Sequence, residues 1–488
     1  MSVTSQVLAQ CEREQLHLSG AIQPHGTLLV VEADGTIAHA AQNTQHYLGA
    51  PPEAWLGQPL PEPLATLATS LGETAGSRRW TLLRLTANSQ PLQAVVTRGA
   101  HGTIVAELVP QEPGEDLGRP SASRRAPTPR TSEEMAADEH AITERIAELT
   151  DFPRVMYYRF REDGDGEVIA ETRRGESYGS YLGLRFPASD IPQVARQLYL
   201  KNPWRMIPAA AAVPVPVLGK TPNPPDLTYS DLRSVSPVHQ VYLANMGVVA
   251  SLSFPVVKRA ELIGLIAAHH SRVQSLPFAV LDQCGALVSR HAQTALNYDL
   301  QQTLRRQDSI TQSVERLRPF VGTLSDIEQN WDAVGDQLLA MFRADGVRLW
   351  SDGLQLERGL SASEADRSPL DDWFSHSEGK GVKYSDNIRR FVAQSLSGNI
   401  AGALCIDGAS RAGDLRLYLT RREHIHEVAW GGNPDKPMEA IVGPLPIAPR
   451  RSFEKWVEKR FGYCRPWNAE ERHLALALRV LLLQELRP

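Results

Sequence analysis

Hydrophobic and polar positions along the chain divide it into α+β blocks, the first of which runs from about Gly20 to Pro110. Two strand-like apolar runs there flank Ala33-Asp34-Gly35. Asp-Gly readily adopts positive φ, so we expect a tight hairpin at this point. From Pro113 to Ser132 the chain carries Pro, Gly, Ser and Arg with almost no apolar periodicity, which is typical of a linker.

The second block is predicted to begin with a helix and to contain two strand pairs. The helix is expected near Glu133–Leu149, and the strands at 155–160, 167–170, 250–257 and 262–269. Between the strand pairs lies a Pro-rich excursion from Pro208 to Pro225, which is long for a structureless loop. Loops of this length are usually functional or disordered.

A long helix follows the second block. Apolar residues recur at helical spacing from Pro277 to about Leu317, with no Pro or Gly after Gly285. A helix of about 40 residues spans roughly 60 Å, far more than one domain core needs. We therefore expect a connecting spine that pairs with its copy in a homodimer. The third block, Arg318 to Pro488, contains strand-like runs at 347–350 and 401–406 and ends in an amphipathic helix.

Length and charge narrow the classes of protein. A chain of 488 residues is too long for one core and suggests roughly three domains. The net charge is −5 and no block is strongly basic, which argues against a nucleic-acid partner. The chain shows neither a signal-peptide pattern after Met1 nor an apolar run of the roughly 20 residues that a membrane span needs. We expect a soluble, cytoplasmic protein.

The four cysteines, Cys11, Cys284, Cys405 and Cys464, contain no Cys-x-x-Cys pair. This spacing argues against both a disulfide framework and a zinc site, so we predict no metal. Cys284 and Cys405 lie in apolar or helical surroundings, where a small buried side chain is expected. Cys11 differs because it lies in a polar segment without apolar neighbours. No nucleophile and base pair or ATP-binding motif is present, so we predict no catalytic residues and no enzyme activity within this chain.

A series of motifs extends over nearly the whole chain. It comprises Cys11-Glu12-Arg13-Glu14, Gly20-Ala21-Ile22-Gln23-Pro24-His25-Gly26, Phe186-Pro187-Ala188-Ser189-Asp190-Ile191-Pro192, Arg233-Ser234-Val235-Ser236-Pro237-Val238-His239, Gly264-Leu265-Ile266-Ala267-Ala268-His269-His270, Trp430-Gly431-Gly432-Asn433-Pro434 and Pro449-Arg450-Arg451-Ser452-Phe453. With these motifs in this order, the chain resembles the photosensory core of the bacterial phytochromes. One motif alone would carry little weight, whereas the series in register is specific.

The resemblance implies an α+β fold of three consecutive domains, PAS, GAF and PHY, with antiparallel sheets and the long helix as a spine. The implied boundaries are 1–19 for an N-terminal segment, 20–112 for PAS, 113–132 for the linker, 133–300 for GAF, 277–317 for the connecting helix and 318–488 for PHY, with a tongue at about 424–458. The N-terminal segment is implied to thread a GAF loop near the Pro-rich excursion in a figure-of-eight knot, an exception to the rule that chains do not thread.

The implied cofactor is biliverdin IXα, a linear tetrapyrrole with two propionates and a long conjugated body. Arg205 and Arg233 each offer a planar fork of donors to a carboxylate, a geometry that Lys cannot reproduce. Ser251 and Ser253, two apart on one strand, point to the same face and add hydroxyls for the second propionate. The residue types therefore suit this ligand independently of the family name.

Further pocket residues are implied by the resemblance. His239 and His269 can hydrogen-bond the pyrrole nitrogens or ring carbonyls. The pocket of the pigment's D ring corresponds to Tyr158, Phe186 and Tyr199. Other implied pigment contacts are Asp190, Ile191, Ser236 and Tyr242. Ordinary alternatives are a core residue for Tyr158, a solvated or ion-paired residue for Arg233, and structural or surface groups for His25 and His270.

Asp190 is the implied switch. In the family its backbone carbonyl faces the pyrrole nitrogens, and its carboxylate pairs with the tongue residue that corresponds to Arg450. Removing one partner of a charge pair shielded from water costs roughly 3–5 kcal/mol. Isomerisation of the D ring is expected to change this pair and to refold the tongue between hairpin and helix, with Trp430 or Ser452 exchanging places at the interface.

Val238 and Cys11 decide which bilin is expected. Plant and cyanobacterial relatives attach their bilin through a cysteine just before the pocket histidine, where this chain has Val238. Cys11 matches the N-terminal anchor of the bacterial members, which implies a thioether to biliverdin. Arg13 favours the thiolate of Cys11 whereas the neighbouring glutamates oppose it, so positioning by the bound pigment explains the attack better than intrinsic reactivity.

The implied function is red/far-red photoreception, in which Z/E isomerisation of the pigment is signalled along the spine to an output domain or effector that this chain does not contain. A second copy of the chain and that effector are the implied protein partners. Two other classes remain open. One is a light-independent GAF module that binds a small molecule such as a cyclic nucleotide, and the other is an enzyme that acts on bilins. The sequence does not predict which state is stable in darkness.

Overall fold

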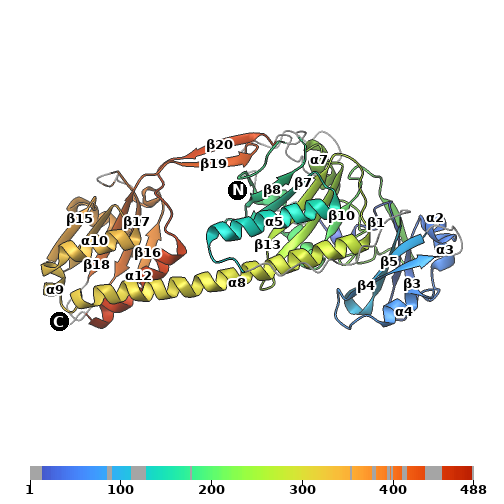
Figure 1. The fold of residues 1–488 in the computed structure, drawn as a ribbon, viewed down its shortest axis with the longest axis horizontal. Coiled ribbons are helices and arrows are strands. Elements are labelled where there is room, and N and C mark those ends of the chain that lie inside the picture. Colours follow the sequence, from blue (N-terminus) through green and yellow to red (C-terminus); the bar gives the residue numbers. More distant parts are fainter. Residues whose placement is uncertain are drawn as a thin grey trace. The chain divides into compact units, whose positions relative to one another are not determined.

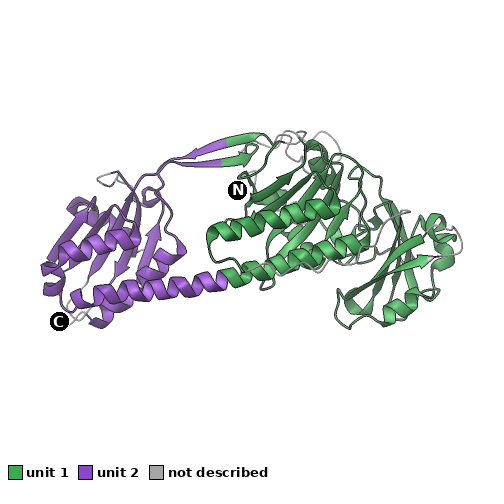
Figure 2. Ribbon diagram, viewed as in Figure 1, with its two compact units in different colours: residues 1–298, 429–456 green, residues 299–428, 457–488 purple. Residues whose placement is uncertain are grey.

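The chain forms two compact units in the computed structural model, which describes residues 14–84, 91–111, 128–175, 179–351, 354–375, 381–392, 396, 399–408, 415–434 and 453–485. Unit 1 comprises Met1–Tyr298 and Ala429–Trp456, and unit 2 comprises Asp299–Val428 and Val457–Pro488 (Figure 2). Each unit has its own hydrophobic core. The first two predicted blocks therefore belong to a single unit.

The first sheet of unit 1 has, within the described ranges, seven strands in the order β1-β11-β3-β2-β6-β5-β4. They are β1 (Ala21–Ile22), β2 (Thr27–Val31), β3 (Ile37–Ala41), β4 (Arg78–Arg84), β5 (Pro91–Arg98), β6 (Ile104–Pro110) and β11 (Val215–Gly219). The short helices are α2 (Thr44–Leu48), α3 (Pro52–Trp55) and α4 (Leu64–Thr69). The predicted hairpin joins β2 to β3, where Asp34 accepts a hydrogen bond from the Thr36 amide at 2.8 Å and Gly35 has a φ of 85°.

Strand β11 belongs to the excursion from Pro208 to Pro225, for which the sequence predicted a functional or disordered loop. It pairs with β1 through Pro216 and Ala21 and with β3 through Leu218 and Ala40. A proline within the run conceals this strand in the sequence, because Pro cannot donate to a ladder. The pairing joins the first two blocks. The figure-of-eight knot stays a prediction, since strand pairing does not establish a threaded path.

The second sheet has the order β10-β12-β13-β7-β8-β9-β19-β20 among the strands that the structure describes. Its strands are β7 (Arg154–Phe160), β8 (Gly166–Arg173), β9 (Arg185–Phe186), β10 (Arg205–Ile207), β12 (Ala250–Lys258), β13 (Glu261–His270), β19 (His426–Gly431) and β20 (Lys455–Arg460). The accompanying helices are α5 (Ser132–Thr150), α6 (Gln193–Tyr199), α7 (Pro237–Asn245) and α8 (Phe278–Leu317). The 40-residue α8 confirms the predicted long helix.

The central strands of this sheet separate a core face from a site face, because successive side chains on a strand point to opposite sides. Tyr157, Phe254 and Ile266 are fully buried in the core, which also contains Phe278 of α8 and Leu28 of β2. Figure 1 shows α5 and the first part of α8 running along the sheet. The alternate residues of β7, β12 and β13 are therefore available on the other face.

Unit 2 contains a sheet whose described strands have the order β15-β14-β18-β17-β16. They are β14 (Gly346–Ser351), β15 (Leu354–Gly359), β16 (Val382–Ser385), β17 (Ile400–Asp407) and β18 (Arg416–Arg422). The helices are α9 (Leu324–Gln329), α10 (Trp331–Phe342), α11 (Arg367–Ser375) and α12 (Ala469–Glu485). Leu474, Leu478 and Leu481 of α12 are buried in the core with Leu417 of β18, as the apolar face of the predicted last helix requires.

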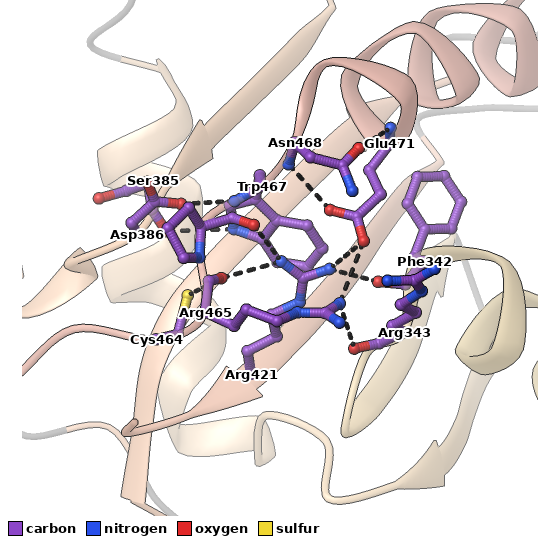
Figure 3. A network of polar contacts seen from close by, with 11 residues as sticks. Phe342, Arg343, Ser385, Asp386, Arg421, Cys464, Arg465, Trp467, Asn468 and Glu471 are labelled. Carbon is purple, nitrogen blue, oxygen red and sulfur yellow. Dashed lines mark hydrogen bonds and ion pairs between the residues drawn. The ribbon is translucent and has the colours of Figure 1, made fainter. Parts of the chain in front are cut away.

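A buried ion pair fixes the start of α12 to the rest of unit 2 (Figure 3). Arg421 Nη2 donates to Glu471 Oε1 at 2.6 Å, and both side chains are almost fully buried. Arg421 Nη1 donates to the Arg465 carbonyl at 2.9 Å, and its guanidinium lies 3.6 Å from the ring centroid of Trp467. Glu471 Oε2 also accepts from the Asn468 amide at 2.9 Å. The ion pair and the helix cap therefore depend on the same carboxylate.

Arg421→Met should loosen α12, because it removes the guanidinium that pairs with the buried Glu471 carboxylate and leaves that charge with fewer hydrogen bonds. Losing one partner of such a pair costs about 3–5 kcal/mol. Native-state hydrogen exchange of the α12 amides measures the change. Arg358→Met is the matched control, since its partners Asp332 and Asp336 are exposed and surface ion pairs contribute little. Equal losses of α12 protection in the two variants would contradict this account.

Candidate functional site

Unit 1 contains a cavity of about 270 Å³ on the site face of the second sheet. The described residues predicted as pigment contacts all line it: Tyr158, Phe186, Asp190, Ile191, Tyr199, Arg205, Arg233, Ser236, His239, Tyr242, Ser251, Ser253 and His269. Neither His25 nor His270 is among the lining residues. Cys11, Arg450 and Ser452 lie outside the described residues.

Three adjacent strands supply one wall of this cavity. Tyr158 comes from β7, Ser251 and Ser253 from β12, and His269 from β13. Ser251 is paired with His269 across the β12–β13 ladder, and Ser253 is paired with Arg205 across the β10–β12 ladder. The sheet register therefore brings together polar groups that are far apart in the sequence.

Aromatic rings form one end of the cavity. The rings of Tyr158 and Phe186 lie 5.9 Å apart, and Tyr181 meets Phe186 edge-on at 5.7 Å. Two glycines leave room for these rings. A Cβ atom on Gly166 would lie 1.8 Å from the Tyr158 ring, and one on Gly431 would lie 2.7 Å from the Phe186 ring. The aromatic end thus depends on the absence of side chains at both positions.

The guanidinium groups of Arg205 and Arg233 lie at a polar part of the cavity and are held by backbone carbonyls. Arg205 Nη1 donates to the Asp231 carbonyl, and Arg205 Nη2 donates to the Arg233 carbonyl at 2.5 Å. Arg233 Nη1 donates to the Leu227 carbonyl at 3.1 Å. Burial and the nearby Arg205 charge lower the pKa of Arg233 to about 9, so the site is positive at neutral pH.

Two cavity histidines are neutral at neutral pH. Burial, followed by the charge of Arg205, lowers the pKa of His239 to about 4. Burial, with Arg154 as the next cause, lowers the pKa of His269 to about 3. His269 Nδ1 is buried and has no hydrogen-bond partner in the described structure. A buried polar atom without a partner is costly, so this nitrogen is suited to a ligand group.

Asp190 and Tyr242 lie near described residues of the predicted tongue. The Tyr242 hydroxyl donates to Asp190 Oδ2 at 2.9 Å. The Phe453 ring meets the Tyr242 ring edge-on at 5.1 Å, and Trp430 of β19 pairs with Arg185 of β9. These contacts lie within unit 1, and Phe453 contacts the cavity wall directly through Tyr242.

Sequence reasoning missed several lining or supporting residues. Tyr181 and Trp204 line the cavity, and Arg154 stacks on the Tyr181 ring at 4.3 Å from its centroid. Asp231 supplies a backbone carbonyl that accepts from Arg205, and burial raises the pKa of its carboxyl to about 6. The aromatic residues carried a weak signal, because an aromatic side chain next to a pocket motif is a candidate wall. Asp231 had none, since a buried carboxylate has no local pattern.

Comparison with known proteins assigns three domain types to this chain. Family models match residues 11–111 (PAS fold), 140–293 (GAF domain) and 311–487 (phytochrome region). A bacteriophytochrome of Pseudomonas aeruginosa is 33% identical over 99% of this chain and 67% of its own length. A bacteriophytochrome of Xanthomonas campestris is 31% identical over 97% of this chain and 78% of its own length. Cyanobacterial phytochrome B of Nostoc is 31% identical over 98% of this chain and 66% of its own length.

Two solved structures are similar along nearly the whole chain. A bacteriophytochrome from R. palustris has a TM-score of 0.78 at 27% identity and covers 97% of this chain and 98% of its own. The Stigmatella aurantiaca phytochrome photosensory core module has a TM-score of 0.77 at 30% identity, with 97% of each chain covered. This chain belongs to the phytochrome family, whose members are photoreceptors that bind a linear tetrapyrrole.

The chain spans about two thirds of the length of the Pseudomonas and Nostoc relatives. Among the helices of the described residues, none is long and apolar enough to cross a bilayer. The same residues contain no group of three or more His, Cys, Asp and Glu side chains that could hold a metal ion.

Acid should destabilise the pigment-free chain through its cavity histidines, of which His269 has a lower pKa than His239. The pKa of His269 is about 3 in the folded chain and 6.5 in the unfolded chain, so between these values the unfolded state binds more protons. The free energy of unfolding then falls with decreasing pH, at roughly 1.4 kcal/mol per unit for this group. Asp231 acts in the opposite direction between pH 3.8 and about 6, because its folded pKa is raised.

Urea titrations at pH 7 and pH 5 measure this effect. His269→Gln should lose less stability on acidification than the unsubstituted chain. His140→Gln, which alters an exposed histidine, should lose as much as the unsubstituted chain. An unchanged acid response in His269→Gln would show that His269 does not carry the effect.

Proposed function

We propose that this chain is a red/far-red photoreceptor module that binds biliverdin IXα covalently through Cys11. The observation that carries the proposal is one cavity with the buried guanidinium of Arg233 beside the half-buried one of Arg205, an aromatic wall in another part, and an unpartnered imidazole nitrogen on the sheet. A bilin needs all three, because it has carboxylates, an apolar conjugated body and a row of pyrrole N–H groups. A small neutral ligand would not need the paired cations.

The polar residues have separate roles in this proposal. Arg205 and Arg233 bind the propionates, and Ser251 and Ser253 add hydroxyl donors. The side-chain hydrogen bonds described for Arg233 use only its Nη1, so the other donors of its guanidinium are suited to a carboxylate. The pigment, when bound, supplies red-light absorption and Z/E isomerisation at its D ring.

The remaining lining residues hold the body of the pigment and limit its movement. His239 and His269, both neutral, hydrogen-bond the pyrrole groups. Tyr158, Phe186 and Tyr199 enclose the D ring. Other pigment contacts are proposed for Asp190, Ile191, Ser236 and Tyr242.

Cys11 is proposed as the anchor on chemical grounds as well as by its motif. The Cys11 thiol would add across a vinyl group of the bound pigment, with sulfur bonding to one carbon and the proton going to the other as the double bond becomes single. The thiolate is the nucleophile in such a step. Burial raises the pKa of Cys284 and of Cys464 to about 12 and also raises that of Cys405. These three buried thiols are poor nucleophiles, and none lines the cavity.

Signalling is proposed to pass from Asp190 to the tongue. Asp190 already accepts from Tyr242, whose ring contacts Phe453. Arg450 would pair with the Asp190 carboxylate, and Trp430 and Ser452 would exchange places when the tongue refolds. A homodimer through the long helix and a downstream effector complete the proposal, and the module is proposed to work in the cytoplasm.

Mixing the purified chain with biliverdin should give a red-absorbing or far-red-absorbing pigment whose spectrum changes reversibly under red and far-red light. Hydrogen exchange at 426–431 and 455–460 should change with the same illumination, because the tongue is the proposed bistable element. Absorbance and exchange are recorded on one sample before and after illumination. A colourless or light-indifferent mixture would end the photoreceptor proposal.

The Cys11→Ser chain is the matched control for attachment. It should bind biliverdin and photoswitch, because the cavity holds the pigment without the thioether. It should release the pigment on denaturation, whereas the unsubstituted chain should retain it. Pigment retained covalently by Cys11→Ser would place the attachment at another residue.

A further inference from the structure

The buried turn from Leu227 to Arg233 carries the carbonyls that orient both cavity arginines. Ser230 and Asp231 in this turn are 1% and 5% exposed. The Asp231 and Arg233 carbonyls accept from Arg205, and the Leu227 carbonyl accepts from Arg233. A displacement of this turn would therefore move both guanidinium groups.

A carboxylate of the first sheet holds this turn. Glu107 lies on β6 and is 1% exposed. Its Oε1 accepts from Ser230 Oγ at 2.6 Å and from the Leu232 amide at 2.7 Å. Ser230 Oγ in turn accepts from the Arg233 amide at 3.1 Å. The hydrogen bonds run from β6 to the backbone of Arg233.

Gln23, which follows β1, holds the same turn from its other side. Its amide donates to the Leu232 carbonyl at 2.7 Å. Its Nε2 donates to the Asp231 and Met206 carbonyls, both at 3.0 Å. Gln23 is 4% exposed, so water does not compete for these bonds. Two buried residues of the first sheet domain, Glu107 and Gln23, thus fix the turn from Leu227 to Arg233.

We propose that Glu107 is a positioning residue of the pigment site, through which the first sheet fixes the guanidinium groups of Arg205 and Arg233 in the orientation that receives the propionates. Glu107 does not line the cavity and acts only through Ser230 and Leu232. The proposal rests on the proposed function, because it assigns the turn's geometry to the recognition of a dicarboxylate. It also makes the first domain a part of the binding site.

Glu107 could instead act by charge, and the two roles predict opposite results. If Glu107 acts as a negative charge near the arginines, it weakens the binding of an anionic ligand. Its neutralisation in Glu107→Gln would then tighten pigment binding, and Glu107→Met would tighten it equally. As a positioning residue, Glu107 needs only an oxygen that accepts from Ser230 and Leu232, which Gln retains and Met lacks.

Pigment titrations of the full chain distinguish these roles. Glu107→Gln should bind biliverdin within about threefold of the unsubstituted chain, and Glu107→Met should bind at least about tenfold more weakly, because two buried donors lose their acceptor. Biliverdin dimethyl ester, which lacks the carboxylates, supplies the second measurement. Glu107→Met and the unsubstituted chain should bind the ester equally, since it does not use the oriented guanidinium groups.

The control variants are Glu139→Gln and Glu139→Met. Glu139 is a buried carboxylate of α5 that pairs with Arg159 in the same unit and does not line the cavity. Both control variants should leave the ratio of biliverdin to ester affinity unchanged. Equal weakening of biliverdin and ester by Glu107→Met would reduce Glu107 to a general structural role and overturn the proposal. Failure of the unsubstituted chain to bind biliverdin would instead overturn the proposed function.

Discussion

Burying positive charge beside a large cavity is the constraint on which unit 1 depends. A guanidinium removed from water must find new hydrogen-bond acceptors, or its burial costs several kcal/mol. Arg205 and Arg233 find theirs in the carbonyls of one short turn. This turn is itself held by Glu107, which accepts hydrogen bonds from it, and by Gln23, which donates to it. Residues of two sheets that a domain boundary would separate therefore hold the cavity arginines jointly.

The same joint construction explains why the first two sequence blocks form one unit. Strand β11 leaves the second block and pairs with β1 and β3 of the first sheet. Leu28 of the first sheet and Ile146 of α5 share a hydrophobic core. Because apolar and polar contacts both cross the boundary, the turn has little freedom to shift. A cavity for a rigid conjugated ligand benefits from such preorganisation.

Local patterns in the sequence were enough for the strands and helices of regular periodicity. The runs that became β7, β12, β13 and α8 alternate or repeat as their structures require. Strand β11 was not predicted, because Pro216 interrupts the pattern of apolar residues expected of a strand. The candidate site residues came from motif resemblance and share one cavity in the structure, but Glu107 and Gln23 were not among them. Their contacts join residues more than a hundred positions apart, and no local signal marks such a pair.

A crystal structure of the chain assembled with biliverdin tests the central claim most directly, namely that the guanidinium groups of Arg205 and Arg233 hold the propionates. The account predicts carboxylate oxygens at about 2.7–2.9 Å from nitrogens of Arg205 and Arg233. It also predicts that the Ser230–Arg233 turn stays bonded to Glu107. Propionates that point into solvent, with both arginines bonded only to backbone carbonyls, would contradict it.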